Sequence, residues 1–143
     1  MNISKFTQKS VQAVQDLEKV AYEYGNQEIE EEHLLYALLT QEDSLILKLI
    51  EKMEIQKEYF IDTVKKALDA KVKVSGGELR FGQYLNKALV SAEDEAKAMG
   101  DEYVSVEHLF LSMLKNPSPS MKKIFNEFGI TRERFLQALS TVR

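Results

Sequence analysis

The chain repeats itself once, at an offset of 75 residues. Residues 6–68 align with residues 81–143 without a gap, and 14 of these 63 positions are identical. The landmarks that match are Phe6 with Phe81, Ala13 with Ala88, Ala21 with Ala96, Gly25 with Gly100, and the triplet Glu32-His33-Leu34 with Glu107-His108-Leu109. One copy of about 65–70 residues makes only a marginal core. The duplication therefore predicts two similar units that pack on each other with pseudo-twofold symmetry, leaving a seam that suits a ligand or peptide.

Each unit is predicted to be helical. The 143 residues include only six glycines and two prolines, and this scarcity of breakers favours helix throughout. The helices predicted for the first unit run from a cap at Thr7 to a stop at Gly25, from about Glu31 to Thr40, from about Ser44 to Met53 after a cap at Asp43, and from about Gln56 to Ala70. The predicted fold is all-α, with eight helices in two pseudo-twofold-related four-helix repeats.

One segment interrupts the helical pattern. Residues 71–78 carry two adjacent glycines and show no helical period, so we expect an exposed and mobile linker there. The predicted organisation is repeat one over residues 1–70, a Gly-containing linker over 71–80 and repeat two over 81–143.

Charge and cysteine content argue against several classes of protein. A formal net charge of −4 disfavours nucleic acid and anionic membrane surfaces as partners, because both attract a basic face. The absence of cysteine excludes disulfides, thiolate zinc sites and a cysteine nucleophile, and it fits a cytoplasmic location. The short apolar runs predict neither a membrane-spanning segment nor a signal peptide.

Motifs for nucleotide or metal chemistry are missing. The sequence contains no phosphate-binding glycine motif and no His-Glu-x-x-His pair. The two histidines, His33 and His108, are repeat equivalents at helix starts, and a structural hydrogen-bonding role is favoured over catalysis for both. A stand-alone helical enzyme that uses the Glu–His pairs for acid–base chemistry stays open as a remote alternative.

The acidic run over residues 28–32 has two interpretations, a metal site or a favourable charge at a helix N-terminus. The second is preferred, because only Glu107 keeps this acidity in the other repeat. The equivalent glutamates Glu32 and Glu107 are each predicted in the first turn of a helix. There each carboxylate either caps the helix or, if exposed at the seam, binds a cation such as a guanidinium.

Several stretches of the two copies are together typical of one family. They are Lys5-Phe6-Thr7, Gly25-Asn26-Gln27-Glu28-Ile29 and Glu32-His33-Leu34-Leu35-Tyr36-Ala37-Leu38-Leu39 in the first copy, and Gly100-Asp101-Glu102-Tyr103-Val104-Ser105-Val106-Glu107-His108-Leu109-Phe110-Leu111 in the second. On these residues the chain resembles, over essentially its whole length, the N-terminal (Clp repeat) domain of the Clp/Hsp100 AAA+ unfoldases. It looks most like the ClpB branch and next like ClpC, whose repeats typically carry Gly-Thr-Glu-His.

The resemblance implies a function. It suggests a client-recognition domain of a ClpB-like protein disaggregase, which binds unfolded or aggregated polypeptide and passes it to the AAA+ hexamer. The ATPase modules would follow this chain in a longer cytoplasmic protein, where they would use ATP and Mg. The domain itself is then expected to be a non-enzymatic, cofactor-free and metal-free monomer that binds clients and adaptor proteins.

The resemblance also implies site residues. In the ClpB branch, a threonine near the start and two acids of the second repeat handle clients, and these positions match Thr7, Asp101 and Glu107. Leu89 matches a position of the family's apolar client groove, whereas two other groove leucines are replaced here by Glu95 and His108.

The alternative is the N-terminal domain of a ClpC-type ATPase subunit of a Clp protease. In that branch the repeat glutamates bind phosphoarginine marks on clients, and they match Glu32 and Glu107. Carboxylates suit the guanidinium of such a mark, and Thr7 offers a hydroxyl for its phosphate at the first of the two sites. The equivalent of Thr7 in the second repeat is Gly82, which offers none.

Overall fold

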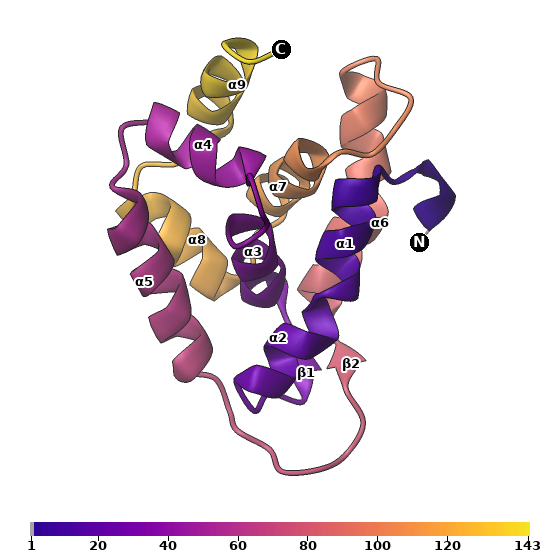
Figure 1. Ribbon diagram of the computed structural model, residues 1–143, viewed down its shortest axis with the longest axis vertical. Coiled ribbons are helices and arrows are strands. Elements are labelled where there is room, and N and C mark those ends of the chain that lie inside the picture. The colour runs from indigo at the N-terminus through magenta and orange to yellow at the C-terminus, as the bar shows by residue number, and fades with distance from the viewer. Residues whose placement is uncertain (1) are drawn as a thin grey trace.

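The computed structural model describes residues 2–143 and is almost entirely helical (Figure 1). A 3₁₀ turn at Ile3–Lys5 comes first, followed by α1 (Gln8–Gln15), α2 (Leu17–Glu23), β1 (Glu28–Ile29), α3 (Glu31–Leu39), α4 (Leu45–Lys52), α5 (Lys57–Asp69), β2 (Arg80–Phe81), α6 (Gln83–Ala98), α7 (Val106–Lys115), α8 (Pro119–Glu127) and α9 (Arg132–Ser140). Only Asp16 separates α1 from α2, and counted as one they give the predicted eight α-helices in the described chain. Across residues 2–143, no helix has the length and apolar character that a bilayer crossing requires.

The two repeats match element by element. Adding 75 to the span of α1 and α2, residues 8–23, gives 83–98, which is the span of α6. The same offset carries the first residue of α3 to the first residue of α7, and it relates α4 to α8 and α5 to α9. The duplication in the sequence is therefore a duplication of the structure.

Local signals set most helix ends. Thr7 caps α1 as predicted, since its hydroxyl oxygen accepts a first-turn backbone N–H. Gly25 and Gly100 end their helices with φ of 69° and 73°, a conformation that glycine adopts at little cost. One predicted cap is wrong. Ser44 rather than Asp43 caps α4, because Asp43 has a φ of 55° whereas Ser44 has the extended backbone that an N-cap needs.

Two short parallel pairings join the repeats. In one, β1 pairs with β2 and Ile29 lies beside Phe81; we call it the β1–β2 seam. In the other, Phe6 lies beside Val104; we call it the N-terminal seam. Phe6 is the equivalent of Phe81 and Ile29 of Val104, so a pseudo-twofold axis relates the two pairings. The predicted symmetric arrangement is confirmed, with each repeat lending its first segment to the other.

One hydrophobic core runs through both repeats. The helices α3 and α7 lie at its centre (Figure 1), and eight residues of each are buried. In the second repeat, Phe110 of α7 stacks on Phe135 of α9 with ring centroids 4.4 Å apart. The shared core agrees with the small size of a single repeat, which alone buries too little apolar surface.

The segment between the repeats follows the bottom of the molecule in Figure 1. Residues 72–78 are exposed, as predicted for a linker. Its first part is nevertheless attached to repeat one, because Val74 N–H donates to Gly25 O at 2.9 Å and Asn26 Nδ2 donates to Val72 O at 3.1 Å. We propose that the domain consists of repeat one over residues 1–70, a linker over 71–80 and repeat two over 81–143. Residue 1 lies outside the described residues.

Candidate functional site

The two histidines are buried parts of the helix N-termini. In each repeat the histidine Nδ1 accepts the backbone N–H three residues earlier, at 2.9 Å for His33 and 2.8 Å for His108. The side chain of that earlier residue, Glu30 or Ser105, accepts the histidine's own backbone N–H and completes a capping box. Because Nδ1 accepts, the ring proton lies on Nε2. The predicted structural role of both histidines is confirmed.

The Nε2–H groups reach partners that differ between the repeats. His33 donates to Asn26 Oδ1 at 2.9 Å, and His108 donates to Asp101 Oδ2 at 2.8 Å. Asn26 and Asp101 are repeat equivalents, so the first repeat has a neutral acceptor and the second a charged one. Burial lowers the pKa of His33 to about 4, and the charge of Lys71 acts in the same direction. His33 is therefore neutral at pH 7.

Glu30, Glu32 and Lys71 form the first acidic site. Lys71 Nζ lies 3.0 Å from Glu30 Oε2 and 3.2 Å from Glu32 Oε2. The side chains of Glu32 and Lys71 are 1% and 13% exposed, and Ser120 also donates to Glu32 Oε2. Burial lowers the pKa of Lys71, but the two glutamates outweigh burial and hold it above its usual value. A largely buried cation from the same chain thus pairs with both carboxylates of this site.

Asp101, Glu107 and Arg143 form the second acidic site. Arg143 Nη2 lies 2.6 Å from Asp101 Oδ2 and 3.2 Å from Glu107 Oε2. Arg143 is 34% exposed and Asp101 27%, whereas Glu107 is 7% exposed. The guanidinium beside Asp101 holds the pKa of that carboxyl below its usual range, and the hydrogen bond from His108 adds to the effect. The cation and the first-turn glutamate of this site are therefore more exposed than Lys71 and Glu32, although Glu30 of the first site is itself 36% exposed.

The prediction for the equivalent glutamates is confirmed in part. Glu32 and Glu107 both lie in the first turn of a helix. Neither is exposed at a seam, and both are paired with a cation that sequence reasoning missed. A sequence signal for these cations exists, because Lys71 and Arg143 are each the first basic residue after the last helix of their repeat.

The N-terminal seam brings the predicted client-handling residues together. Thr7 N–H donates to Val104 O at 3.0 Å, which fixes the start of α1 against the segment between α6 and α7. Val104 lies three residues from both Asp101 and Glu107 in the chain, so the residues of the second acidic site flank the strand position that Thr7 contacts. Near it, Ile3 and Tyr103 are 49% and 52% exposed.

Leu89, the predicted groove residue, is not on this surface. Its side chain is 1% exposed and belongs to the core, on the buried face of α6. A client would reach it only after α6 moved away from its neighbours. Of the replaced groove positions, Glu95 is buried and receives a hydrogen bond from Arg132 Nη2 at 2.6 Å.

The β1–β2 seam contains a pocket of about 400 Å³ whose lining includes Glu31, Phe81 and Tyr84. Glu31 is buried; its Oε1 accepts the N–H of Ser118 at 2.7 Å, and its Oε2 has no partner among the described residues. Burial raises the pKa of Glu31 to about 7. The equivalent residue in the second repeat is Val106, so this titratable group belongs to one repeat only.

Close packing explains why Gly82 replaces a threonine at this seam. The N–H of Gly82 donates to Ile29 O at 2.8 Å. A Cβ atom at Gly82 would lie 2.9 Å from Glu28 Oε1 and 3.3 Å from Ile29 O. The entry to α6 therefore has no side-chain cap, whereas Thr7 supplies one to α1.

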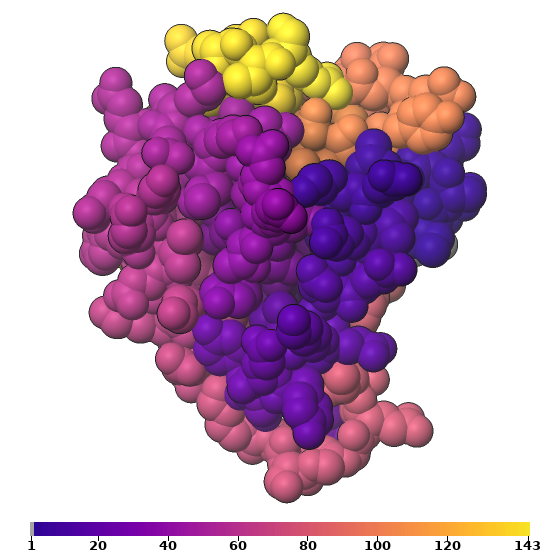
Figure 2. Space-filling model, in the orientation of Figure 1, coloured from indigo at the N-terminus to yellow at the C-terminus, as the bar shows by residue number. Residues whose placement is uncertain are grey.

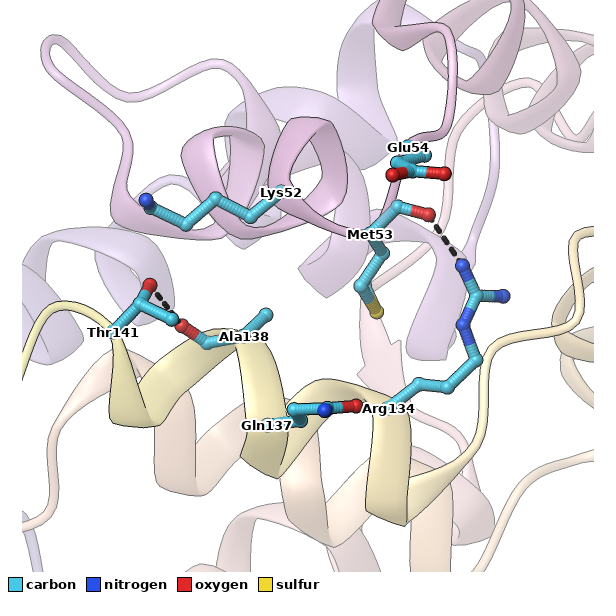
Figure 3. Close-up of a pocket in the computed structure, with 7 residues that line it drawn as sticks. All are labelled: Lys52, Met53, Glu54, Arg134, Gln137, Ala138 and Thr141. Atoms are coloured by element: carbon cyan, nitrogen blue, oxygen red, sulfur yellow. Dashed lines mark hydrogen bonds between the residues drawn. The ribbon is translucent and has the colours of Figure 1, made fainter.

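A further pocket of about 390 Å³ lies between the end of α4 and α9 (Figure 3). Its wall on the α4 side is Lys52, Met53 and Glu54, and its wall on the α9 side is Arg134, Gln137, Ala138 and Thr141. The Arg134 guanidinium donates to Met53 O, so the pocket is bridged by a contact between the repeats. The predicted site residues do not line it. Within residues 2–143, no group of three or more His, Asp or Glu side chains is placed to hold a metal ion.

The fold defines the class: an all-helical domain made from two fused copies of one four-helix repeat. The chain belongs to the Clp repeat N-terminal domain family, whose model matches residues 5–140. It is 39% identical, over its whole length, to the chaperone protein ClpB of Nitratidesulfovibrio vulgaris. The chain spans 17% of that relative's length.

Solved structures agree with this assignment of the fold. The Hsp104 N-terminal domain of Candida albicans superposes with a TM-score of 0.80 at 21% identity, covering 94% of this chain and 88% of that one. A ClpV N-domain solved in complex with a VipB peptide superposes with a TM-score of 0.70 at 21% identity, covering 96% and 89%. The predicted family and the all-α fold are confirmed.

Proposed function

We propose that this chain is the client-recognition domain of a ClpB-like disaggregase, and that exposed segments of unfolded or aggregated polypeptide bind at its N-terminal seam. The observation that carries the proposal is the contact of Thr7 with Val104, which lies three residues from both Asp101 and Glu107 in the chain and next to the exposed side chain of Tyr103. Carboxylates and apolar groups together suit an unfolded segment, which presents both basic and apolar residues.

The comparisons support the same function. The chain is 39% identical to the N-terminal part of a ClpB chaperone. A ClpV N-domain of the same fold was solved with a bound peptide, which makes peptide binding a natural use of this architecture. In the proposed full-length protein, ATP and Mg act in AAA+ modules outside this chain, the modules form a cytoplasmic hexamer, and the domain hands over clients or adaptors to it.

An NMR titration of the domain with a permanently unfolded, apolar polypeptide tests the proposal. Amide shifts are expected around Thr7, Asp101 and Glu107. Asp101→Asn should weaken binding about threefold, because it removes a partly exposed charge while keeping the acceptor that His108 needs, as Asn26 does for His33. The matched control is Asp62→Asn on α5, where an equally simple charge loss should leave affinity unchanged. Absence of saturable shifts at the seam would overturn the proposal.

A second candidate is the adaptor- or phosphoarginine-binding domain of a ClpC-type protease. A specific observation favours it: a guanidinium already lies between Asp101 and Glu107. Thr7 supplies a hydroxyl at the same seam for the phosphate of such a mark. Saturable binding of free phosphoarginine that is lost in a Glu32→Gln, Glu107→Gln double variant supports this candidate, and silence in that titration removes it.

A further inference from the structure

We propose that Arg143 is a built-in competitor at the second acidic site. Its guanidinium occupies the place of a basic side chain from a client segment, and the segment must displace it to bind. This inference rests on the proposed function. It adds the chemistry of the ligand at that site and a control on access to it.

Arg143 does not bind either carboxylate with two parallel hydrogen bonds. Its ion pairs with Asp101 Oδ2 and Glu107 Oε2 go through the same nitrogen, Nη2. A guanidinium bound most strongly uses two parallel N–H donors against a carboxylate. An arginine from an extended client segment, whose backbone is not tied to this domain, can approach with that better geometry.

The first acidic site offers a comparison, because its cation is more deeply buried. There Lys71 is 13% exposed and Glu32 1%, and Ser120 donates to Glu32 as well. Arg143 is 34% exposed and stands over a glutamate that is almost completely buried. Lys71 is held by two glutamates and is less exposed than Arg143, so we expect exchange of the cation to be harder in repeat one than in repeat two.

The position of Arg143 places this exchange beside the proposed client surface. Figure 2 shows the yellow C-terminal segment against orange residues of the second repeat, and the ion pair of Arg143 with Asp101 joins the two. Asp101 lies three residues before Val104 in the chain. Val104 is paired with Phe6 in the N-terminal seam. A polypeptide bound along this seam thus passes within reach of the second acidic site.

The energetics fit a competitor that can be displaced. An ion pair with an exposed partner contributes little net free energy, because water solvates both charges when it opens. A site that its own competitor occupies most of the time binds an external ligand with an affinity reduced by the free fraction. Removing Arg143 should therefore raise the affinity for a basic segment about fivefold.

The test uses two unfolded peptides with the same apolar residues, one with arginines and one with neutral citrullines in their place. Arg143→Ala should bind the arginine peptide about fivefold more tightly than the unchanged chain and the citrulline peptide equally well. Arg143→Gln repeats the test with a side chain of similar length. The matched control is Arg80→Ala, which removes a guanidinium paired with Glu28 at the β1–β2 seam and should change neither affinity.

Each outcome bears on a different claim. Unchanged or weaker binding of the arginine peptide by both Arg143 variants overturns the competitor, as does an equal gain for the citrulline peptide. If the unchanged chain still binds unfolded polypeptide at the N-terminal seam, the proposed function survives that result. If neither the unchanged chain nor the variants bind either peptide, the proposed function itself fails.

Discussion

Glu32 and Glu107 occupy the same position in two copies of one repeat, yet their surroundings differ. Glu32 is buried and contacts Lys71 and Ser120, while Glu107 contacts Arg143, whose side chain is about one third exposed. The neighbouring acceptor is neutral Asn26 in repeat one and charged Asp101 in repeat two. The two glutamates lie at equivalent positions of equivalent helices, whereas the charged and polar residues that contact them differ between the repeats.

This difference teaches which part of a duplicated fold is free to specialise. The shared core constrains both repeats, because a cavity in either removes apolar contacts from one continuous cluster. A buried charge must be paired, and the fold does this with a lysine in repeat one and an arginine in repeat two. In repeat one the ion pair of the glutamate is largely buried. In repeat two its arginine partner is more exposed, and in our proposal a basic side chain of a client competes with that arginine.

The largest expected effect tests whether the two repeats contribute equally to the stability of the shared core. Leu34→Ala and Leu109→Ala remove repeat-equivalent side chains that are both 0% exposed. Each should lower the free energy of unfolding by about 4 kcal/mol, because a cavity remains in one continuous core. Urea denaturation followed by circular dichroism measures this. Two separate unfolding transitions, or very different costs, would show that the repeats do not share stability.

The next effect belongs to repeat one alone. The carboxyl of Glu31 titrates near 4.5 when unfolded and near 7 when folded, so the folded state binds this proton more tightly. Below pH 4.5 the burial of Glu31 therefore does not lower the free energy of unfolding. As pH rises to 7 it lowers that free energy progressively, by about 3 kcal/mol at pH 7. Glu31→Gln should be more stable than the unchanged chain by about this amount at pH 8 and equally stable at pH 4.

His33 acts in the opposite direction and must be separated from Glu31. Its pKa is lowered from 6.5 to about 4, so the stability it contributes is complete above pH 6.5 and is lost as pH falls toward 4. Between pH 4.5 and 6.5 the two residues oppose each other. In Glu31→Gln only the His33 effect remains, and its stability should fall steadily on acidification through that range. A flat profile for the variant would contradict the assignment to His33, and a difference between variant and unchanged chain that does not grow from pH 4 to pH 8 would contradict the assignment to Glu31.

A smaller effect contrasts the two cations. Lys71→Ala leaves the buried Glu32 without its main partner and should cost about 2 kcal/mol, less than for a fully isolated charge because Ser120 still donates to it. Arg143→Ala should cost less than about 1 kcal/mol, because water can solvate the opened site. Chemical denaturation at pH 7 compares them. Equal costs would remove the distinction between a sealed and an open site.

The smallest effect concerns the turn after the third helix of each repeat. Glu54 has a φ of 62°, and its equivalent Gly129 has the same φ of 62°. A residue with a Cβ is strained in this conformation, whereas glycine is not. Glu54→Gly should therefore stabilise the chain by about 0.5 kcal/mol, after the entropy that glycine adds to the unfolded chain is subtracted. A loss in melting temperature would mean that the Glu54 side chain contributes a contact worth more than the strain.

Much of the fold was accessible from the sequence. The 75-residue offset predicted the two repeats, Gly25 and Gly100 predicted the helix ends, and Thr7 predicted a cap. The cap at Asp43 was wrong, because the sequence offers two neighbouring cap residues and only the backbone conformation selects between them. The break at Asp16 was also missed, since residues 8–23 have a continuous helical period.

The site was accessible only in part. The positions of Glu32, Glu107, His33 and His108 in first helical turns follow from local sequence. Their partners Lys71 and Arg143 do not, because each lies about 36–39 residues away along the chain and reaches its glutamate only after the last helix of the repeat has packed.

The sequence by itself therefore determined the repeat, the helical class and the family, because periodicity, glycine stops and duplicated motifs are local properties of the chain. The tertiary structure alone decided which acids are sealed, which are open and which cation meets each of them. Burial and ion pairing depend on distances between segments that are remote in sequence, and in a duplicated fold those distances distinguish two sites that the sequence presents as equivalent.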